Sequence, residues 1–171
     1  MGRRYALKRF VFLFALFASV GFVLVLGPLM APYVEFYTRS IATLSGAIIR
    51  IAGGHVQVAD FTLTAPATGL SIVVVNGCNG INVVVMLWSA QLAWPGRWAN
   101  KVKGMVLGAV LIQVANTLRV ISLFYLNQWN KAWFEWMHLY VWEILIMLLG
   151  LAVFALSIRQ TPAPAVSDGA K

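Results

Sequence analysis

The sequence predicts an all-α polytopic membrane protein: a bundle of about four transmembrane helices with an external amphipathic helix and a small β-hairpin. Of its 171 residues, 61% are hydrophobic and 11% are charged, and the mean hydropathy is +0.82. An ordinary soluble domain has about 45 to 50% apolar residues, so this composition indicates a lipid bilayer as the surroundings. The formal charge of +8 comes from short basic segments beside apolar runs, which argues against nucleic acid as a partner.

Four apolar stretches have, or nearly have, the roughly 20 residues that a helix needs to cross a hydrocarbon core. We place the spans at residues 10–30, 79–94, 104–126 and 138–158. The second is short, and we expect it to be extended or tilted. With the external segment 31–77, the spans form one membrane domain over residues 1–158. Residues 159–171 are rich in proline and small polar residues, which predicts a disordered cytoplasmic tail.

Basic residues outside the spans are divided unequally between the two sides of the membrane. One side has nine and the other three. The nine are Arg3, Arg4, Lys8, Arg9, Arg97, Lys101, Lys103, Arg159 and Lys171; the three are Arg39, Arg50 and Lys131. Because Lys and Arg accumulate in cytoplasmic loops, we expect both termini in the cytoplasm. A signal peptide is the alternative for the first span, but its apolar run exceeds the usual 7 to 15 residues.

The external segment divides into a helical part and a strand part. An apolar stripe at helical spacing predicts an amphipathic helix in the membrane interface, which ends at Gly53. The stripe consists of Tyr37, Ile41, Leu44, Ile48 and Ile51. Residues 55–64 and 70–75 are rich in β-branched side chains and flank a turn at 65–69, which predicts a hairpin. The second strand leads directly to the start of the second span.

The only cysteine, Cys78, lies where the external segment enters the second span. A helix start favours negative charge, so this position predicts a lowered thiol pKa, as a nucleophile requires. Gly77 and Gly80 would allow a substrate to approach closely, and Asn79 would cap the helix through its side-chain oxygen. The alternative interpretation of Cys78 is a small buried residue.

Two further side chains that are costly in a membrane, Arg119 and His138, are expected near the same face. Arg119 lies about 10 Å inside the third span, where it costs about 2.5 to 3.5 kcal/mol and needs a partner or a cavity. Asn116, on the same helix face, is a candidate support. Arg119 either forms a structural ion pair with Glu143, at a similar depth, or stabilises charge on a carbonyl oxygen. His138 either exchanges a proton with the thiol or is simply interfacial.

No motif in the sequence indicates a metal or a cofactor, and we expect neither. There is no Cys/His cluster at zinc spacing, no GxSxG, no HExxH and no glycine-rich phosphate loop. A non-enzymatic membrane assembly factor, held together by Arg119 and Glu143, is the main alternative to an enzyme. A small channel or transporter is less favoured, because the spans contain few polar residues to line a pore.

Three segments resemble the cysteine, arginine and histidine blocks of the exosortase and archaeosortase family. They are Asn76-Gly-Cys-Asn-Gly-Ile81, Asn116-Thr-Leu-Arg-Val-Ile121 and His138, within residues 70–145. The resemblance implies a membrane cysteine protease or transpeptidase that cleaves a C-terminal sorting signal of exported proteins through a thioester and transfers the new C-terminus to an acceptor. It gives Cys78 the role of nucleophile, His138 that of acid and base, and Arg119 that of oxyanion stabiliser.

The same resemblance implies partners and a location. The substrates would be exported proteins with a C-terminal transmembrane helix, and the acceptor would be water or an amine. The enzyme would lie in the bacterial inner membrane with its active site on the periplasmic side. Many family members have more spans than this chain, so it resembles a short member of the exosortase H type.

Overall fold

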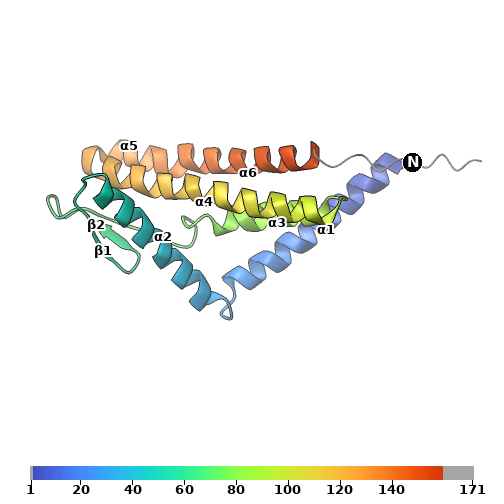
Figure 1. The fold of residues 1–171 in the computed structure, drawn as a ribbon, viewed down its shortest axis with the longest axis horizontal. Helices are drawn as coiled ribbons and strands as arrows, with labels where there is room; N and C mark the ends of the chain where they lie inside the picture. Colours follow the sequence, from blue (N-terminus) through green and yellow to red (C-terminus); the bar gives the residue numbers. More distant parts are fainter. Residues whose placement is uncertain (1, 160–171) are drawn as a thin grey trace, which may run out of the picture.

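Helices make up most of the protein. The computed structural model describes residues 2–159, with side chains from residue 5 onward, so the predicted disordered tail lies almost wholly outside the described residues. The elements are α1 (Gly2–Leu26), α2 (Ala31–Ile51), β1 (Gln57–Ala59), β2 (Thr62–Thr64), β3 (Ser71–Val73), α3 (Ile81–Ala93), α4 (Trp98–Trp129), α5 (Lys131–Trp136), the π-helix η1 (Met137–Val141) and α6 (Trp142–Arg159). In Figure 1, α4 runs alongside α6, and the sheet lies at one end with α2.

Among the described residues, three helical segments are long and apolar enough to cross a membrane. They are Tyr5–Leu26, Trp98–Trp129 and Lys131–Arg159. The predicted second span corresponds to α3, which has 13 residues. Its length of about 20 Å is less than a hydrocarbon core of about 30 Å, so the predicted count of four spans is not confirmed. A multi-pass membrane protein is nevertheless supported.

The short helix α3 packs against α1, α4 and α6. Small residues permit close contact between these helices. A Cβ added at Gly21 of α1 would meet Val85 of α3, and one added at Gly108 of α4 would meet Leu87 of α3. Such residues let helix backbones approach closely within a membrane. A buried hydrophobic cluster joins α3 to α4 and α6, and its members are Leu87, Ile112, Ile146 and Val153. The longer helices therefore hold α3 in place, and with it the loop that carries Cys78.

The predicted hairpin is a three-stranded antiparallel sheet, with strand order β1-β2-β3. The first predicted strand, residues 55–64, turns back on itself at Asp60, which has φ +51°. Gln57 of β1 therefore pairs with Thr64 of β2. The sheet and its loops pack against α2 and α4 in one core, whose buried members are Ile41, Ala42, Ile49, Val56, Leu63, Ala65, Val74, Val120 and Phe124.

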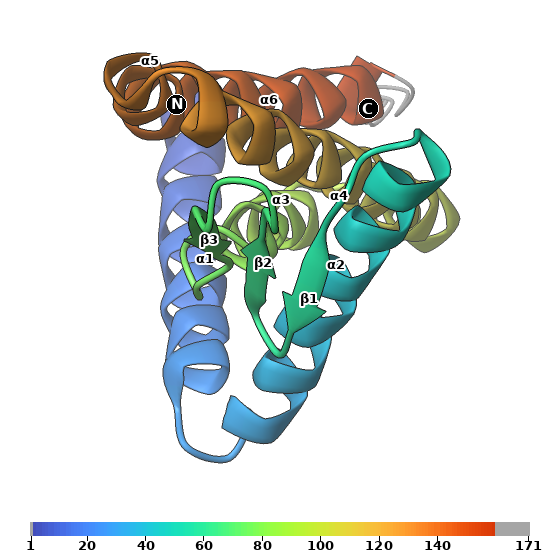
Figure 2. The ribbon, with the colours of Figure 1, turned by 90° about the vertical axis from the view of Figure 1, so that its left-hand side faces the viewer.

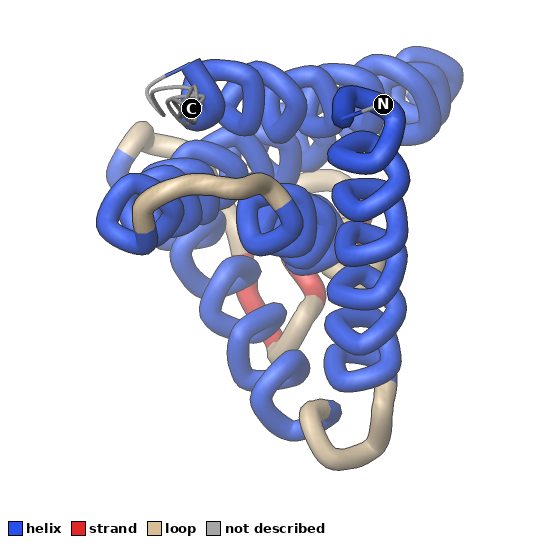
Figure 3. The backbone as a smooth tube through the Cα atoms, turned by 90° about the vertical axis from the view of Figure 1, so that its right-hand side faces the viewer, coloured by secondary structure: helices blue, strands red, loops and turns tan. Residues whose placement is uncertain are grey.

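The amphipathic helix α2 begins at Ala31, with Pro32 in its first turn, where proline is tolerated. Figures 2 and 3 show α1 and α2 diverging from the turn between them. The stripe predicted to face the membrane interface lies largely outside the protein core. Ile41 is buried, but Leu44, Ile48 and Ile51 are exposed. The positions buried instead are Val34, Thr38, Ala42, Ser45, Gly46 and Ile49, because the sheet and α4 cover that side.

Candidate active site

Cys78 lies in a tight loop between β3 and α3. Its backbone N–H donates to the carbonyl of Val75 at 2.8 Å, which closes a turn directly after the strand. The next residue, Asn79, is buried and donates from Nδ2 to the Thr38 hydroxyl of α2 at 3.0 Å. Its Oδ1 accepts from the N–H of Ile81 at 3.1 Å. The side chain of Asn79 therefore joins the thiol loop to both α2 and the first residue of α3.

The cap predicted at Asn79 is off by one residue, although Oδ1 of Asn79 does accept from the N–H of the first residue of α3. The N-cap itself is Gly80, with φ +76°, a backbone conformation that glycine adopts readily. A Cβ at Gly80 would lie 2.9 Å from Nε2 of Gln113 and 3.4 Å from Cγ of Asn116, so Gly80 packs against α4. A Cβ added at Gly77 would meet nothing within 4 Å. Of the two glycines predicted to admit a substrate, only Gly77 has open space.

The three side chains singled out from the sequence lie together. The Cys78 sulfur is 3.9 Å from Nε2 of His138 and 3.7 Å from Nη2 of Arg119. Nη2 of Arg119 also donates to the backbone carbonyl of His138 at 3.4 Å. The loop before α3, the helix α4 and the π-helix η1 thus bring a guanidinium and an imidazole to the same thiol, and the sequence predicted that these three groups share one membrane face.

Arg119 contacts Glu143 and the thiol with different nitrogens. Its side chain is 5% exposed, and Nη1 lies 3.4 Å from Oε2 of Glu143. The predicted ion pair therefore forms, yet it leaves Nη2 directed at the sulfur. The predicted support from Asn116 is wrong, because both amide atoms of this fully buried side chain lack a hydrogen-bond partner within the described residues. The described neighbours that hold the guanidinium are the carboxylate and the His138 carbonyl.

His138 lies within a helix and does not begin one. Residues 127–137, which join the third and fourth predicted spans and were expected to form a loop, are helical except at Asn130. The Asn130 side chain accepts hydrogen bonds from the N–H groups of Ala132 and Trp133 and caps α5. The helix then widens into η1, and such π-helical turns occur frequently at functional sites. The His138 ring stacks on Phe134, with centroids 5.6 Å apart and planes 2° apart. Nδ1 of His138 is buried without a described partner.

The Cys78 thiol is less acidic than its place near a helix start suggested. Burial raises its pKa, the Arg119 guanidinium lowers it, and the Glu143 carboxylate raises it, with a net upward shift. The thiol precedes the first residue of α3 by three positions, and burial outweighs the charges around it. The predicted lowering of the pKa is therefore wrong, so the resting group is a neutral thiol that needs a base.

A cavity of about 230 Å³ opens beside these residues. Its walls are residues 71–75, one face of α4 and Phe134, together with Cys78, Arg119 and His138. Sequence reasoning missed Phe134, although it stands four residues before His138 and would share its helix face. That helical spacing has no meaning in a loop, which is what the sequence predicts for residues 127–137. Among residues 2–159, no group of three or more His, Cys, Asp or Glu could hold a metal ion.

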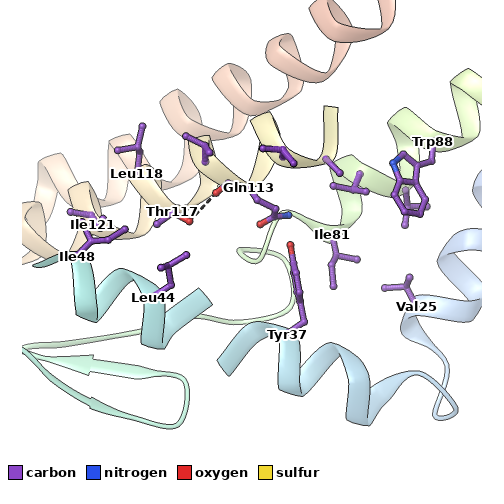
Figure 4. Close-up of a pocket in the computed structure, with 15 residues that line it drawn as sticks. Val25, Tyr37, Leu44, Ile48, Ile81, Trp88, Gln113, Thr117, Leu118 and Ile121 are labelled. Carbon is purple, nitrogen blue, oxygen red and sulfur yellow. Dashed lines mark hydrogen bonds between the residues drawn. The ribbon is translucent and has the colours of Figure 1, made fainter. Parts of the chain in front are cut away.

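A second, apolar groove of about 700 Å³ lies on another face of α4 (Figure 4). Its lining comes from α1, α2, α3 and α4 and includes none of the three site residues. Tyr37 and Gln113 point toward one another in it, and the amide atoms of Gln113 have no hydrogen-bond partner in the part of the chain that the structure describes. Burial raises the pKa of Tyr37 to about 12, so its hydroxyl is neutral. This groove offers hydrophobic contact but no reactive group.

Comparison with known protein families gives a match to this chain. A family model described as transmembrane exosortase matches residues 3–157, a longer stretch than residues 70–145 that carry the resemblance in the sequence. No curated protein and no solved structure matches the chain. The family predicted from the cysteine, arginine and histidine blocks is confirmed, whereas the exosortase H type stays a prediction.

Proposed function

Because the chain belongs to the transmembrane exosortase family, we propose that it is a membrane cysteine transpeptidase that cleaves a C-terminal sorting signal of exported proteins and transfers the new C-terminus to an acceptor. One observation carries the proposal: the Cys78 sulfur lies 3.9 Å from the His138 imidazole and 3.7 Å from the Arg119 guanidinium. A nucleophile, a base and a cation within one cavity are the groups that acyl transfer through a thioester requires.

The first step forms the thioester. Nε2 of His138 takes the proton of the neutral Cys78 thiol as the sulfur attacks the scissile carbonyl carbon. A C–S bond forms, and the carbonyl π electrons move to the oxygen, where Nη2 of Arg119 stabilises the negative charge. When the oxyanion collapses, the C–N bond breaks and His138 returns the proton to the departing amine. The sorting signal leaves with its own transmembrane helix.

The second step releases the enzyme. An acceptor amine or a water molecule attacks the thioester carbonyl, His138 takes its proton, and the C–S bond breaks to give the thiolate, which is then protonated by His138. An amine acceptor makes the enzyme a transpeptidase, and water makes it a peptidase. This chemistry needs no metal ion or cofactor.

The proposal includes a topology in the bacterial inner membrane. Both termini lie in the cytoplasm, and the thiol loop, the sheet and α5 lie on the periplasmic side, where exported substrates arrive. Arg97, between α3 and α4, together with Lys101 and Lys103 near the start of α4, supports this orientation through the positive-inside rule. A substrate held by its own membrane helix would reach Cys78 from within the plane of the bilayer.

A non-enzymatic assembly factor is the second candidate, favoured by the buried Arg119 and its contact with Glu143 at 3.4 Å. In that case the ion pair would hold α4 to α6, and Cys78 would have no chemical role. The two candidates differ in what they predict for the thiol. Removing the Cys78 sulfur should abolish precursor processing if the chain is a transpeptidase, and should change nothing if it is an assembly factor.

The decisive test is to compare the C-termini of exported proteins in cells that make the wild-type chain or the Cys78→Ala variant. We expect precursors that retain a C-terminal hydrophobic segment to accumulate only with Cys78→Ala, as measured by mass spectrometry of envelope proteins. Immunoblotting of membranes checks that both chains reach the same abundance. Unchanged C-termini at equal abundance would falsify the proposed activity.

A further inference from the structure

The strand β3 has a free edge that faces the cavity beside Cys78. In the sheet order β1-β2-β3, only one side of β3 is paired. Residues 71–75, which are β3 and the two residues after it, all line the cavity that also contains Cys78, Arg119 and His138. An extended backbone and the reactive thiol therefore border the same space.

Hydrogen bonds to β2 reveal which backbone groups of β3 point to the free edge. The N–H of Ala65 donates to the carbonyl of Leu70 at 2.9 Å, and the N–H of Val74 donates to the carbonyl of Phe61 at 2.8 Å. Backbone groups of successive residues point to opposite sides of an antiparallel strand. The even-numbered residues of this segment therefore face β2. The residues that face away from it are Ser71, Val73 and Val75.

Two of the outward residues already have partners for their carbonyl groups. The Ser71 carbonyl accepts from Nδ2 of Asn127 on α4 at 3.2 Å, and the Val75 carbonyl accepts from the N–H of Cys78 at 2.8 Å. Val73 lies between them, is paired with Thr62 only as a non-hydrogen-bonded neighbour, and is 55% exposed. Within the described part of the chain, its N–H and C=O thus remain available together.

We propose that the substrate segment next to the scissile bond binds beside β3 as a fourth strand, with its backbone hydrogen-bonded to the N–H and C=O of Val73. A donor and an acceptor on a strand edge are matched by another extended peptide backbone. The occupant is a peptide because the same cavity contains the acyl-transfer site, so this inference rests on the proposed function. Pairing at Val73 would hold an extended chain beside Cys78 largely irrespective of its side chains.

A proline at Val73 tests the pairing on the enzyme. Val73→Pro removes the outward N–H and leaves the ladder to β2 intact, as is tolerated at a strand edge. Val73→Ala is the matched control, because it shortens the same side chain and keeps the N–H. With the full-length chain in nanodiscs and a precursor that accumulates in Cys78→Ala cells, we expect processing by Val73→Pro to be about tenfold slower than processing by Val73→Ala.

A scan of N-methylated substrates tests the same pairing with the enzyme unchanged. Synthetic copies of the precursor's C-terminal segment, each with one N-methyl group, are cleaved by the wild-type chain in nanodiscs. We expect alternate positions before the scissile bond to lose about tenfold in rate and the positions between them to be tolerated. Equal tolerance at every position, with the unmethylated segment cleaved, overturns the strand pairing and leaves the proposed function standing. Failure to cleave the unmethylated segment and the precursor overturns both.

Discussion

Opposing charges surround the Cys78 thiol, and each is expected to move its pKa in a known direction. Arg119 favours the thiolate and Glu143 opposes it. Arg119→Gln removes the cation, so the pKa should rise further. Glu143→Gln removes the anion, so the pKa should fall. Because the chain has one cysteine, the pH dependence of iodoacetamide alkylation in nanodiscs reports on this thiol alone. Shifts of the same sign in both variants would contradict the arrangement of the three groups.

Arg119 should matter more to turnover than its ion-pair partner does. Its Nη2 contacts the sulfur and the His138 carbonyl, whereas Glu143 contacts only Nη1. Loss of one oxyanion donor lowers turnover by about 10² to 10³, which we expect for Arg119→Ala. Glu143→Gln should cost about tenfold or less, since it keeps a hydrogen-bond acceptor beside Nη1. Rates of precursor processing, normalised to the amount of folded enzyme, measure both.

The competing assembly role predicts another outcome for these two variants. If the ion pair only joins α4 to α6, Arg119→Ala and Glu143→Gln should each reduce membrane abundance. The C-termini of exported proteins would then be the same with either variant as with the wild-type chain. Immunoblots and rates from the same membranes separate the two possibilities.

At the scale of the elements, the π-helix η1 sets the direction of His138. A π-helical turn contains one residue more than an α-helical turn. Deletion of Leu139 should restore α-helical winding and rotate the preceding residues by about 100° relative to α6, which takes the imidazole away from Cys78. We expect processing to fall at least about a hundredfold with normal membrane insertion.

A cross-linking experiment separates rotation of residue 138 from general misfolding of the Leu139 deletion variant. In a His138→Cys chain, dibromobimane should join residue 138 to Cys78, and the further deletion of Leu139 should prevent this cross-link. Deletion of the exposed Leu156, near the end of α6, is the control and should preserve the cross-link. Retention of the cross-link after deletion of Leu139 would show that η1 does not position His138.

The sequence predicted the position of the three site residues better than the local backbone around them. The order of Cys78, Arg119 and His138 along successive apolar segments was sufficient to predict their meeting, because segment order determines which ends share a membrane face. The reversal at Asp60 was not predicted, because a single aspartate with no glycine or proline beside it is only a weak turn signal. The π-helix and the raised pKa of Cys78 were also missed. The raised pKa comes from burial of the thiol by segments that are distant in the sequence.

At the scale of the whole molecule, the number of membrane crossings depends on α3. With α1, α4 and the segment from α5 to α6 as the only spans, the termini would lie on opposite sides of the membrane. If α3 also crosses, both termini lie in the cytoplasm. The helix has 13 residues, but α1, α4 and α6 surround it. Protein contacts on three sides reduce the need for α3 to match the full thickness of the lipid.

We therefore predict that the short helix does carry the chain across. Arg97, Lys101 and Lys103 follow α3 directly, and such clusters stay in the cytoplasm. Alkaline phosphatase, which is active only outside the cytoplasm, should be inactive when fused after Gly96 or after Arg159. It should be active when inserted after Gly69 in the external sheet, which is the matched control. Activity after Gly96 would place Arg97, Lys101 and Lys103 outside the cytoplasm and would limit the chain to three crossings. Cys78 and these basic residues would then lie on the same side of the membrane.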